Sequence, residues 1–104
     1  MSNLANTLTD RVQIQRRVAT MTATGETIAW KLIETRFARV VPLDARAIAT
    51  YQQLQSQVSH RVIFRGSISL AIGDNRLLWA GKVLEIEQPV REAKGISTVI
   101  VREA

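Results

Sequence analysis

The sequence predicts a mainly β domain, a small antiparallel β-barrel or sandwich of about six or seven strands with one inserted helix or mobile loop. Two observations predict the strands: apolar and polar residues alternate in runs such as RVQIQRRV (residues 11–18), and Gly-, Asp- or Asn-containing turn signals separate these runs. A third observation predicts the insertion, because residues 44–58 carry apolar side chains at helical spacing. With 104 residues, of which 46% are apolar, we expect residues 1–104 to form a single domain with one core.

The first predicted strand follows a polar N-terminal segment, residues 1–10, that we expect to be flexible. Val12, Ile14 and Val18 then fall on one face of the strand, which is the face that a half-buried strand turns toward a core. The small residues at positions 20–27, which include one Gly, predict a hairpin loop.

The second predicted strand contains a change of apolar phase. Trp30 and Leu32 stand at even positions, whereas the apolar series continues at odd positions from Phe37 onward. A slip of one residue moves side chains to the other face of a sheet, so we expect a bulge or a short break near residues 33–36. Pro42 ends this strand because it has no N–H to give to a ladder.

The segment 44–58 predicts one amphipathic helix. Asp44 is the expected N-cap, since its side chain can accept a hydrogen bond from the first turn. The apolar face consists of residues that recur at helical spacing, Ile48, Tyr51, Leu54 and Val58. Four glutamines leave the outer face polar and nearly uncharged: Gln52, Gln53, Gln55 and Gln57.

Five further strands are expected after this insertion, because alternation returns and turn signals separate the runs. The turn residues Ala80 and Gly81 predict a hairpin between two of them. The five predicted strands are residues 60–65, 68–72, 76–79, 82–88 and 96–102.

The charge balance favours acidic partners. The net charge is +5, and eleven of the fourteen cationic residues are Arg, which pairs bidentately with carboxylates and phosphates. The cations are scattered from Arg11 to Arg102 without a basic block, so we interpret most of them as solvated or protein-contact residues. The sequence contains no Cys, no apolar run long enough for a membrane helix and no visible secretory signal, and we expect no disulfide and no membrane contact.

No residue pattern points to catalysis. The single histidine, His60, argues against a metal site or a His-based triad, and we expect it at the start of a strand or on the surface. Glu85 and Glu87 lie two residues apart and are interpreted as a solvent-facing strand edge in preference to an acid–base pair. We therefore expect no enzymatic activity and no cofactor. A second function class stays open, an OB-like nucleic-acid-binding barrel that uses Arg61, Arg65, Arg76 and Lys82 with Trp79.

The ordered series of segments resembles a known family. The segments that carry the resemblance are ARVVPLDAR (38–46), HRVIFR (60–65) and NRLLWAGKVLEIE (75–87), within a match that covers nearly the whole chain. The chain resembles the phage head-tail joining family, the head-closure (stopper) or head-tail connector proteins of long-tailed phages. The residues after Pro42 depart from the usual family pattern of a Gly and an acidic residue, since Asp44-Ala45-Arg46 stands there.

The resemblance implies a structural virion protein of a phage or prophage. Such proteins form a homo-oligomeric ring, usually of about twelve copies by family resemblance, between the portal or adaptor and the tail. Double-stranded DNA passes through the lumen without sequence-specific binding, and the ring helps to retain it. The implied location is the head-tail junction of the virion, and the host cytoplasm during assembly. A tail-completion or terminator ring is an alternative that follows the same logic.

Two groups of residues are expected to serve this role. Twelve compact spheres of this length would leave a lumen of roughly 90 Å, so we expect the subunit to be elongated or a segment to project inward. We expect the insertion 42–59 to be this channel or assembly segment, either as a mobile gate or as a fixed helix over one barrel end. Its expected residues are Asp44, Arg46, Tyr51, Gln52, Gln53, Gln55 and Gln57, and the expected subunit-contact residues are Arg36, Arg39, Arg61, Arg65, Glu85 and Glu87.

Overall fold

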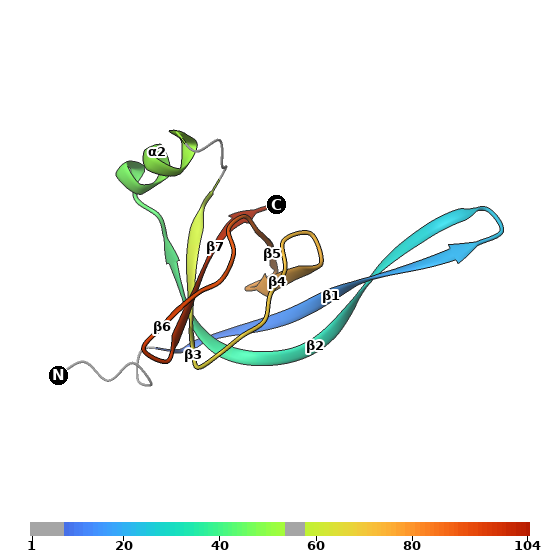
Figure 1. Cartoon of the computed structure of the whole chain (residues 1–104), viewed down its shortest axis with the longest axis horizontal. Helices are drawn as coiled ribbons and strands as arrows, with labels where there is room; N and C mark the ends of the chain where they lie inside the picture. The colour runs from blue at the N-terminus through green and yellow to red at the C-terminus, as the bar shows by residue number, and fades with distance from the viewer. Residues whose placement is uncertain (1–7, 54–57) are drawn as a thin grey trace.

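The computed structural model describes residues 8–53 and 58–104 and contains seven strands and one helix in these parts (Figure 1). The elements are β1 (Asp10–Thr22), β2 (Gly25–Pro42), α2 (Ala45–Gln53), β3 (His60–Arg65), β4 (Asn75–Trp79), β5 (Lys82–Ile86), β6 (Arg91–Ala93) and β7 (Ile96–Glu103). The mainly β class with one inserted helix is confirmed.

All seven strands belong to one antiparallel sheet in the order β3-β2-β1-β4-β5-β7-β6. An additional pairing of β3 with β7, from His60 opposite Val101 to Arg65 opposite Ile96, closes six of the strands partly into a ring. The short strand β6 pairs with the start of β7. We refer to this partly closed sheet as the body of the subunit.

The core of the body follows from the alternation that predicted the strands. Inward-facing residues of every strand in the circuit are buried, and Phe64, Leu77 and Leu84 are the largest of those that are fully enclosed. The core cluster consists of Val12, Ile14, Ala38, Val40, Val62, Phe64, Leu77, Leu84, Ile86, Val99 and Val101. Ile68 and Leu70 pack against this cluster although they belong to no strand.

Beyond the body, β1 and β2 continue as a projecting hairpin (Figure 1), which we name the arm, residues 17–22 of β1 and 25–32 of β2. The predicted loop over residues 20–27 is wrong in extent, because the ladder runs on to Thr22 opposite Gly25 and only Ala23 and Thr24 make the turn. The arm gives the molecule extents of 57 × 31 × 24 Å. Val18, expected in the core, lies on the arm and is exposed.

The predicted bulge is confirmed at the base of the arm. Ile14 lies opposite Glu34 and the next residue, Gln15, lies opposite Leu32, so Ile33 is an extra residue on β2. The extra residue exchanges the two faces of β2, so the odd-numbered Phe37, which is 58% exposed, continues on the outward face of Trp30 and Leu32, and the core residues of β2 are the even-numbered Ala38 and Val40.

The helix begins as predicted. The Asp44 Oδ1 atom accepts a hydrogen bond from the Ala47 backbone N–H at 2.8 Å, which is the geometry of an N-cap. The described helix ends at Gln53, residues 54–57 lie outside the described residues, and Val58 is buried outside any helix. The predicted extension of the helix to Val58 is therefore not observed at that residue.

Other expectations need correction. Residues 68–72 form no strand, because the Ala71 backbone is engaged by the following turn: its carbonyl accepts from the Asn75 N–H and its N–H donates to the Asn75 side chain. His60 starts β3, one of the two expected places for it, and it is buried there. Of the segment 1–10, residues 1–7 lie outside the described residues, whereas Leu8 is buried and Asp10 already belongs to β1.

We predict that Leu77→Ala lowers the free energy of unfolding by about 2–5 kcal/mol, because Leu77 is fully buried and a cavity would remain. Leu32→Ala is the matched control, since Leu32 is 51% exposed on the arm, and its cost is expected to stay below about 1 kcal/mol. Urea-induced unfolding of both variants measures the difference, and equal losses would contradict the placement of the core.

We also predict that Ala80→Asn stabilises the fold by about 0.5–1 kcal/mol. Ala80 and Gly81 both adopt positive φ, 51° and 78°, in the two-residue turn between β4 and β5. Asn tolerates this conformation better than Ala, and Asn-Gly is a preferred pair for such turns. Thermal unfolding should show a higher midpoint for the variant, and a lower midpoint would exclude backbone strain at this turn.

Candidate assembly surfaces

The arm presents an apolar stripe that contacts the body at its base, through Trp30. Residues directly opposite each other share a face, so Leu32, Trp30, Ile28 and Met21 follow one another along the same side. The Arg17–Glu26 ion pair lies on this side too, since Arg17 is opposite Trp30 and Glu26 is opposite Met21. Met21 is 77% exposed and Leu32 51% exposed. Within the described residues, β1 beyond Arg16 and β2 before Ala38 pair with no strand except each other. A two-stranded hairpin is marginal by itself in water, so this surface is suited to contact another molecule.

The base of the arm borders a hollow of about 410 Å³ on the outside of the body. Trp30 and Ile72 contribute apolar surface, and Glu85 and Glu87 contribute carboxylates. The Arg76 guanidinium lies 4.4 Å from the centre of the Trp30 ring, and its Nε donates to the Gln15 side chain at 2.7 Å. These contacts fix the side chain of Trp30 where the arm leaves the body.

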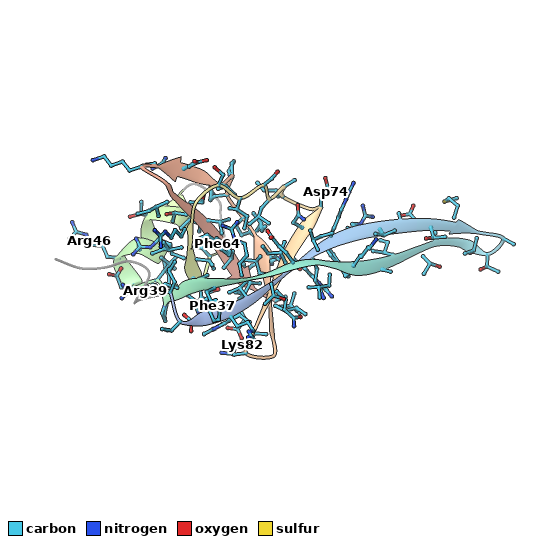
Figure 2. The ribbon with its side chains drawn as sticks, turned by 90° about the horizontal axis from the view of Figure 1, so that it is seen from below. Phe37, Arg39, Arg46, Phe64, Asp74 and Lys82 are labelled. Carbon is cyan, nitrogen blue, oxygen red and sulfur yellow. The ribbon has the colours of Figure 1, made fainter. Side chains whose placement is uncertain are left out.

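A second surface gathers arginines on the outer face of β2, β3, β7 and β6. We name it the arginine face, defined by Arg39, Arg61, Arg65 and Arg91, all of them exposed. One row across four strands runs from Arg39 to Ile63, Thr98 and Arg91. In the neighbouring rows Arg61 lies opposite Ile100 and Arg65 lies opposite Ile96. Figure 2 shows Arg39 at the end of the molecule away from the arm.

A groove of about 470 Å³ runs along this arginine face. Arg61 and Arg91 stand on it, and Pro89, Val90 and Ile100 provide apolar lining. The backbone of residues 87–88 is held against β7, because the Glu87 and Gln88 N–H groups both donate to the Ile100 carbonyl. The groove therefore combines cationic side chains with a rigid apolar lining.

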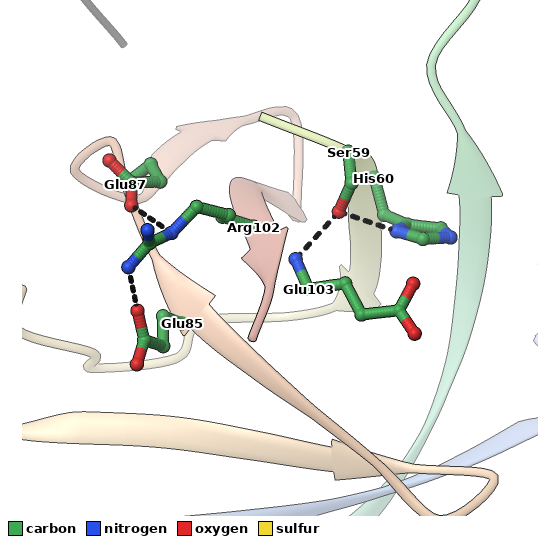
Figure 3. Close-up of polar contacts among 6 residues, drawn as sticks. All are labelled: Ser59, His60, Glu85, Glu87, Arg102 and Glu103. Atoms are coloured by element: carbon green, nitrogen blue, oxygen red, sulfur yellow. Dashed lines mark hydrogen bonds and ion pairs between the residues drawn. The ribbon is translucent and has the colours of Figure 1, made fainter. Parts of the chain in front are cut away.

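The predicted subunit-contact residues divide between surfaces. Arg39, Arg61 and Arg65 come together on the arginine face, whereas Glu85 and Glu87 both pair with Arg102, which lies beside this face, two residues beyond Ile100 on β7 (Figure 3). The Arg102 Nε lies 3.0 Å from a Glu87 carboxylate oxygen.

Arg36 lies inside the subunit's own network. Its guanidinium donates to the backbone carbonyls of Arg65 and Ser67 and lies 5.7 Å from the centre of the buried Phe64 ring. It thereby stabilises the strand end and the turn that follows β3. Sequence reasoning missed this role, and it also missed Arg91 and the arm, although the alternation of Ile28, Trp30 and Leu32 was visible.

The insertion 42–59 is anchored at its two ends. The Leu43 N–H donates to the Ser59 carbonyl at 2.9 Å, and the Ser59 N–H donates to the Val101 carbonyl at 2.9 Å. The Ser59 hydroxyl accepts from the Glu103 N–H at 2.8 Å and shares a 2.8 Å hydrogen bond with His60 Nδ1 (Figure 3). The base of the insertion is therefore tied to the last strand.

Five of the seven expected channel residues lie in the described part of the insertion. Asp44 caps α2, and Arg46 is exposed in its first turn, at the end of the molecule away from the arm (Figure 2). Tyr51, Gln52 and Gln53 belong to α2, while Gln55 and Gln57 lie outside the described residues. The channel role of these residues stays a prediction.

The residues of the nucleic-acid alternative do not form one groove. Arg61 and Arg65 lie on β3, which neighbours β2 and β7, whereas Arg76 and Lys82 lie on β4 and β5. Trp79 is half-buried with its ring edge-on to His60 at 5.7 Å, and Lys82 Nζ lies 5.6 Å from its centre. No group of three His, Asp or Glu residues that could hold a metal ion occurs among residues 8–53 and 58–104. The helix in this described part is too short to cross a membrane.

Comparison with known proteins agrees with this architecture. The solution structure of protein SF1141 from Shigella flexneri 2a is similar to this chain with a TM-score of 0.78 at 21% sequence identity, over 93% of each chain. At this identity the likeness shows a shared fold. No curated protein sequence matches the chain. A family model described as phage head completion protein matches residues 4–102, and since this range spans nearly all of the sequence, the chain belongs to the phage head completion protein family.

Proposed function

We propose that copies of this chain assemble into a ring that completes the phage head at the head-tail junction. The observation that carries the proposal is the arm, whose apolar stripe and free strand edges need a partner surface. Family membership supports the head-closure role. In this role the protein acts as a structural virion component and not as an enzyme.

The dimensions of the arm support contact between neighbouring copies. Six residues of an extended strand, such as residues 17–22, reach about 20 Å. The two shorter extents of the molecule are 31 and 24 Å, so an arm can lie across most of the body of the next copy. An arm that contacts a different surface on its neighbour is a heterologous interface, and such interfaces generate rings when the rotation closes.

The remaining parts of the proposal come from the resemblance to head-tail joining proteins. The ring has about twelve copies by family resemblance, with the portal or adaptor on one side and tail proteins on the other. DNA passes through the lumen, and the insertion 42–59 borders it and helps to retain the DNA. The residues of this segment are polar and nearly uncharged, which favours free movement of DNA past them, because cationic side chains would bind the DNA phosphates. A tail-completion ring has the same shape, and co-purification with the portal complex distinguishes the two.

We predict that Met21→Ser combined with Ile28→Ser weakens association between copies by about 100-fold, since two buried apolar side chains would be lost from the interface. Native mass spectrometry over a concentration series measures the association. Val18→Ser combined with Ala29→Ser is the matched control, because these two residues lie opposite each other on the other face of the arm.

The control is expected to associate like the unmodified chain, and circular dichroism checks that both variants keep the sheet. Equal association of all three proteins would show that the apolar stripe is not the contact. A chain that stays monomeric at every concentration, alone and with portal complex, would overturn the ring itself.

We further predict that the backbone amides of α2 exchange hydrogen more slowly in the assembled ring than in the isolated subunit. The insertion is tied at its base through Leu43 and Ser59, so slower exchange would come from contacts of its helix with neighbouring copies. Hydrogen exchange with mass spectrometry measures peptides from α2, and β3 peptides serve as the internal control. Equal and strong protection in both states would favour a fixed helix over a segment that orders on assembly.

A further inference from the structure

The four cations of the arginine face have no carboxylate partner in the part of the chain that the structure describes. No ion pair joins Arg39, Arg61, Arg65 or Arg91 to an acidic side chain. The outward positions between them hold Val41, Ile63, Ile96, Thr98 and Ile100, none of which is acidic. The next outward residue of β7, Arg102, adjoins this surface and is itself paired with Glu85 and Glu87. Like charges on one sheet face disfavour one another, so the isolated subunit carries a concentrated positive surface that an acidic partner would stabilise.

A second copy of this chain is a poor source of that acidic partner. Glu85 and Glu87 pair with Arg102, and Glu103 lies 3.6 Å from Lys82. The remaining carboxylates of the described residues bind within the chain too: Glu26 to Arg17, Glu34 to Arg36, Asp10 and Asp44 to backbone N–H groups, and Glu92 to Ser67. Asp74 alone among them has a side chain with no such contact, and one carboxylate cannot neutralise four arginines.

We propose that the arginine face binds an extended acidic segment of a different protein. The arginines alternate with aliphatic residues, and the groove between Arg61 and Arg91 is lined by Pro89, Val90 and Ile100. Such lining accepts apolar side chains of a polypeptide, whereas a DNA backbone offers only phosphates and sugars. The guanidinium groups form bidentate pairs with carboxylates.

The spacing of the cations fits an extended chain. Arg61 and Arg65 are four residues apart on one strand, a separation of about 13 Å, which equals the separation of residues i and i+4 in an extended peptide. From Arg39 to Arg91 the row crosses three strand spacings, about 14 Å. A peptide that runs along β3, with acidic residues four positions apart and an apolar residue between them, would therefore meet Arg61 and Arg65. The row from Arg39 to Arg91 crosses the strands, so a peptide in that direction would meet Arg39 and Arg91 instead.

This proposal rests on the proposed function in one respect only: if the ring forms, the acidic segment belongs to a protein that adjoins the ring. Binding itself requires a single subunit, because all four arginines and the groove belong to one chain. If the chain forms rings but binds no acidic peptide, the binding proposal is wrong and the ring proposal stands. If the chain binds the peptide but does not assemble, the ring proposal is wrong and the binding proposal stands.

Fluorescence anisotropy with a fluorescein-labelled peptide, rich in Glu with interspersed Leu, tests the proposal on the full chain. Arg61→Gln combined with Arg91→Gln is expected to weaken binding about tenfold. Arg16→Gln combined with Lys31→Gln is the matched control, since it removes the same two charges from exposed strand positions that lie opposite each other at the arm, and it should bind within about twofold of the unmodified chain. Circular dichroism checks that the exposed substitutions leave the fold unchanged.

Two competitor ligands complete the experiment. A peptide with Gln in place of every Glu should bind weakly, and mixed-sequence double-stranded DNA should fail to displace the acidic peptide. Displacement by DNA at a lower concentration than by unlabelled acidic peptide would identify a DNA-contacting face and overturn the proposal. Equal binding of the peptide by the Arg61→Gln, Arg91→Gln variant and the unmodified chain would overturn it too.

Discussion

Pairing of β3 with β7 is the constraint on which the other features of this molecule depend. It joins two strands that lie more than thirty residues apart in the sequence and closes six strands partly into a ring. Closure determines which alternate residues are enclosed, so Val62 and Phe64 enter the core together with Val99 and Val101. The same pairing places Arg61 and Arg65 beside the outward residues of β7, and without it the arginine face would not exist.

The extra residue in β2 separates the body from the arm. On the body side of Ile33 the even-numbered residues of β2 face inward, as the burial of Ala38 and Val40 shows. On the arm side the even-numbered residues Leu32 and Trp30 lie on the same face as the outward-facing Gln15 and Arg17 of β1, which they oppose. The extra residue therefore turns an apolar series that would have faced the core toward the outside, where it forms the exposed stripe.

Local alternation predicted most strands because it records burial directly, as in HRVIFR, where Val62 and Phe64 are enclosed and Arg61 and Arg65 are exposed. Alternation failed for residues that are buried without belonging to a strand, and for strand residues that are not buried. Ile68 and Leu70 pack on the core without a strand, because the turn that follows engages the Ala71 backbone. The arm is a strand pair without burial, so the Thr- and Gly-containing sequence of its outer half, residues 20–27, predicts a loop where the ladder continues. The arginine face could not be predicted, since it requires knowledge of which distant strands are neighbours.

The two exposed surfaces differ in the physical force that each can use, and this difference bears on the order of assembly. The arm combines an apolar stripe with an internal pair of Arg17 and Glu26, so its association depends on burial and responds weakly to salt. The arginine face depends on charges that stay unbalanced within the subunit, so contacts there weaken as ionic strength rises. Copies that share a net charge of +5 repel one another at long range, and the apolar contact must overcome this repulsion. Neutralisation of the arginine face by an acidic segment would lower that repulsion. Binding of the acidic partner and association of copies would then favour each other without any change of shape in the subunit.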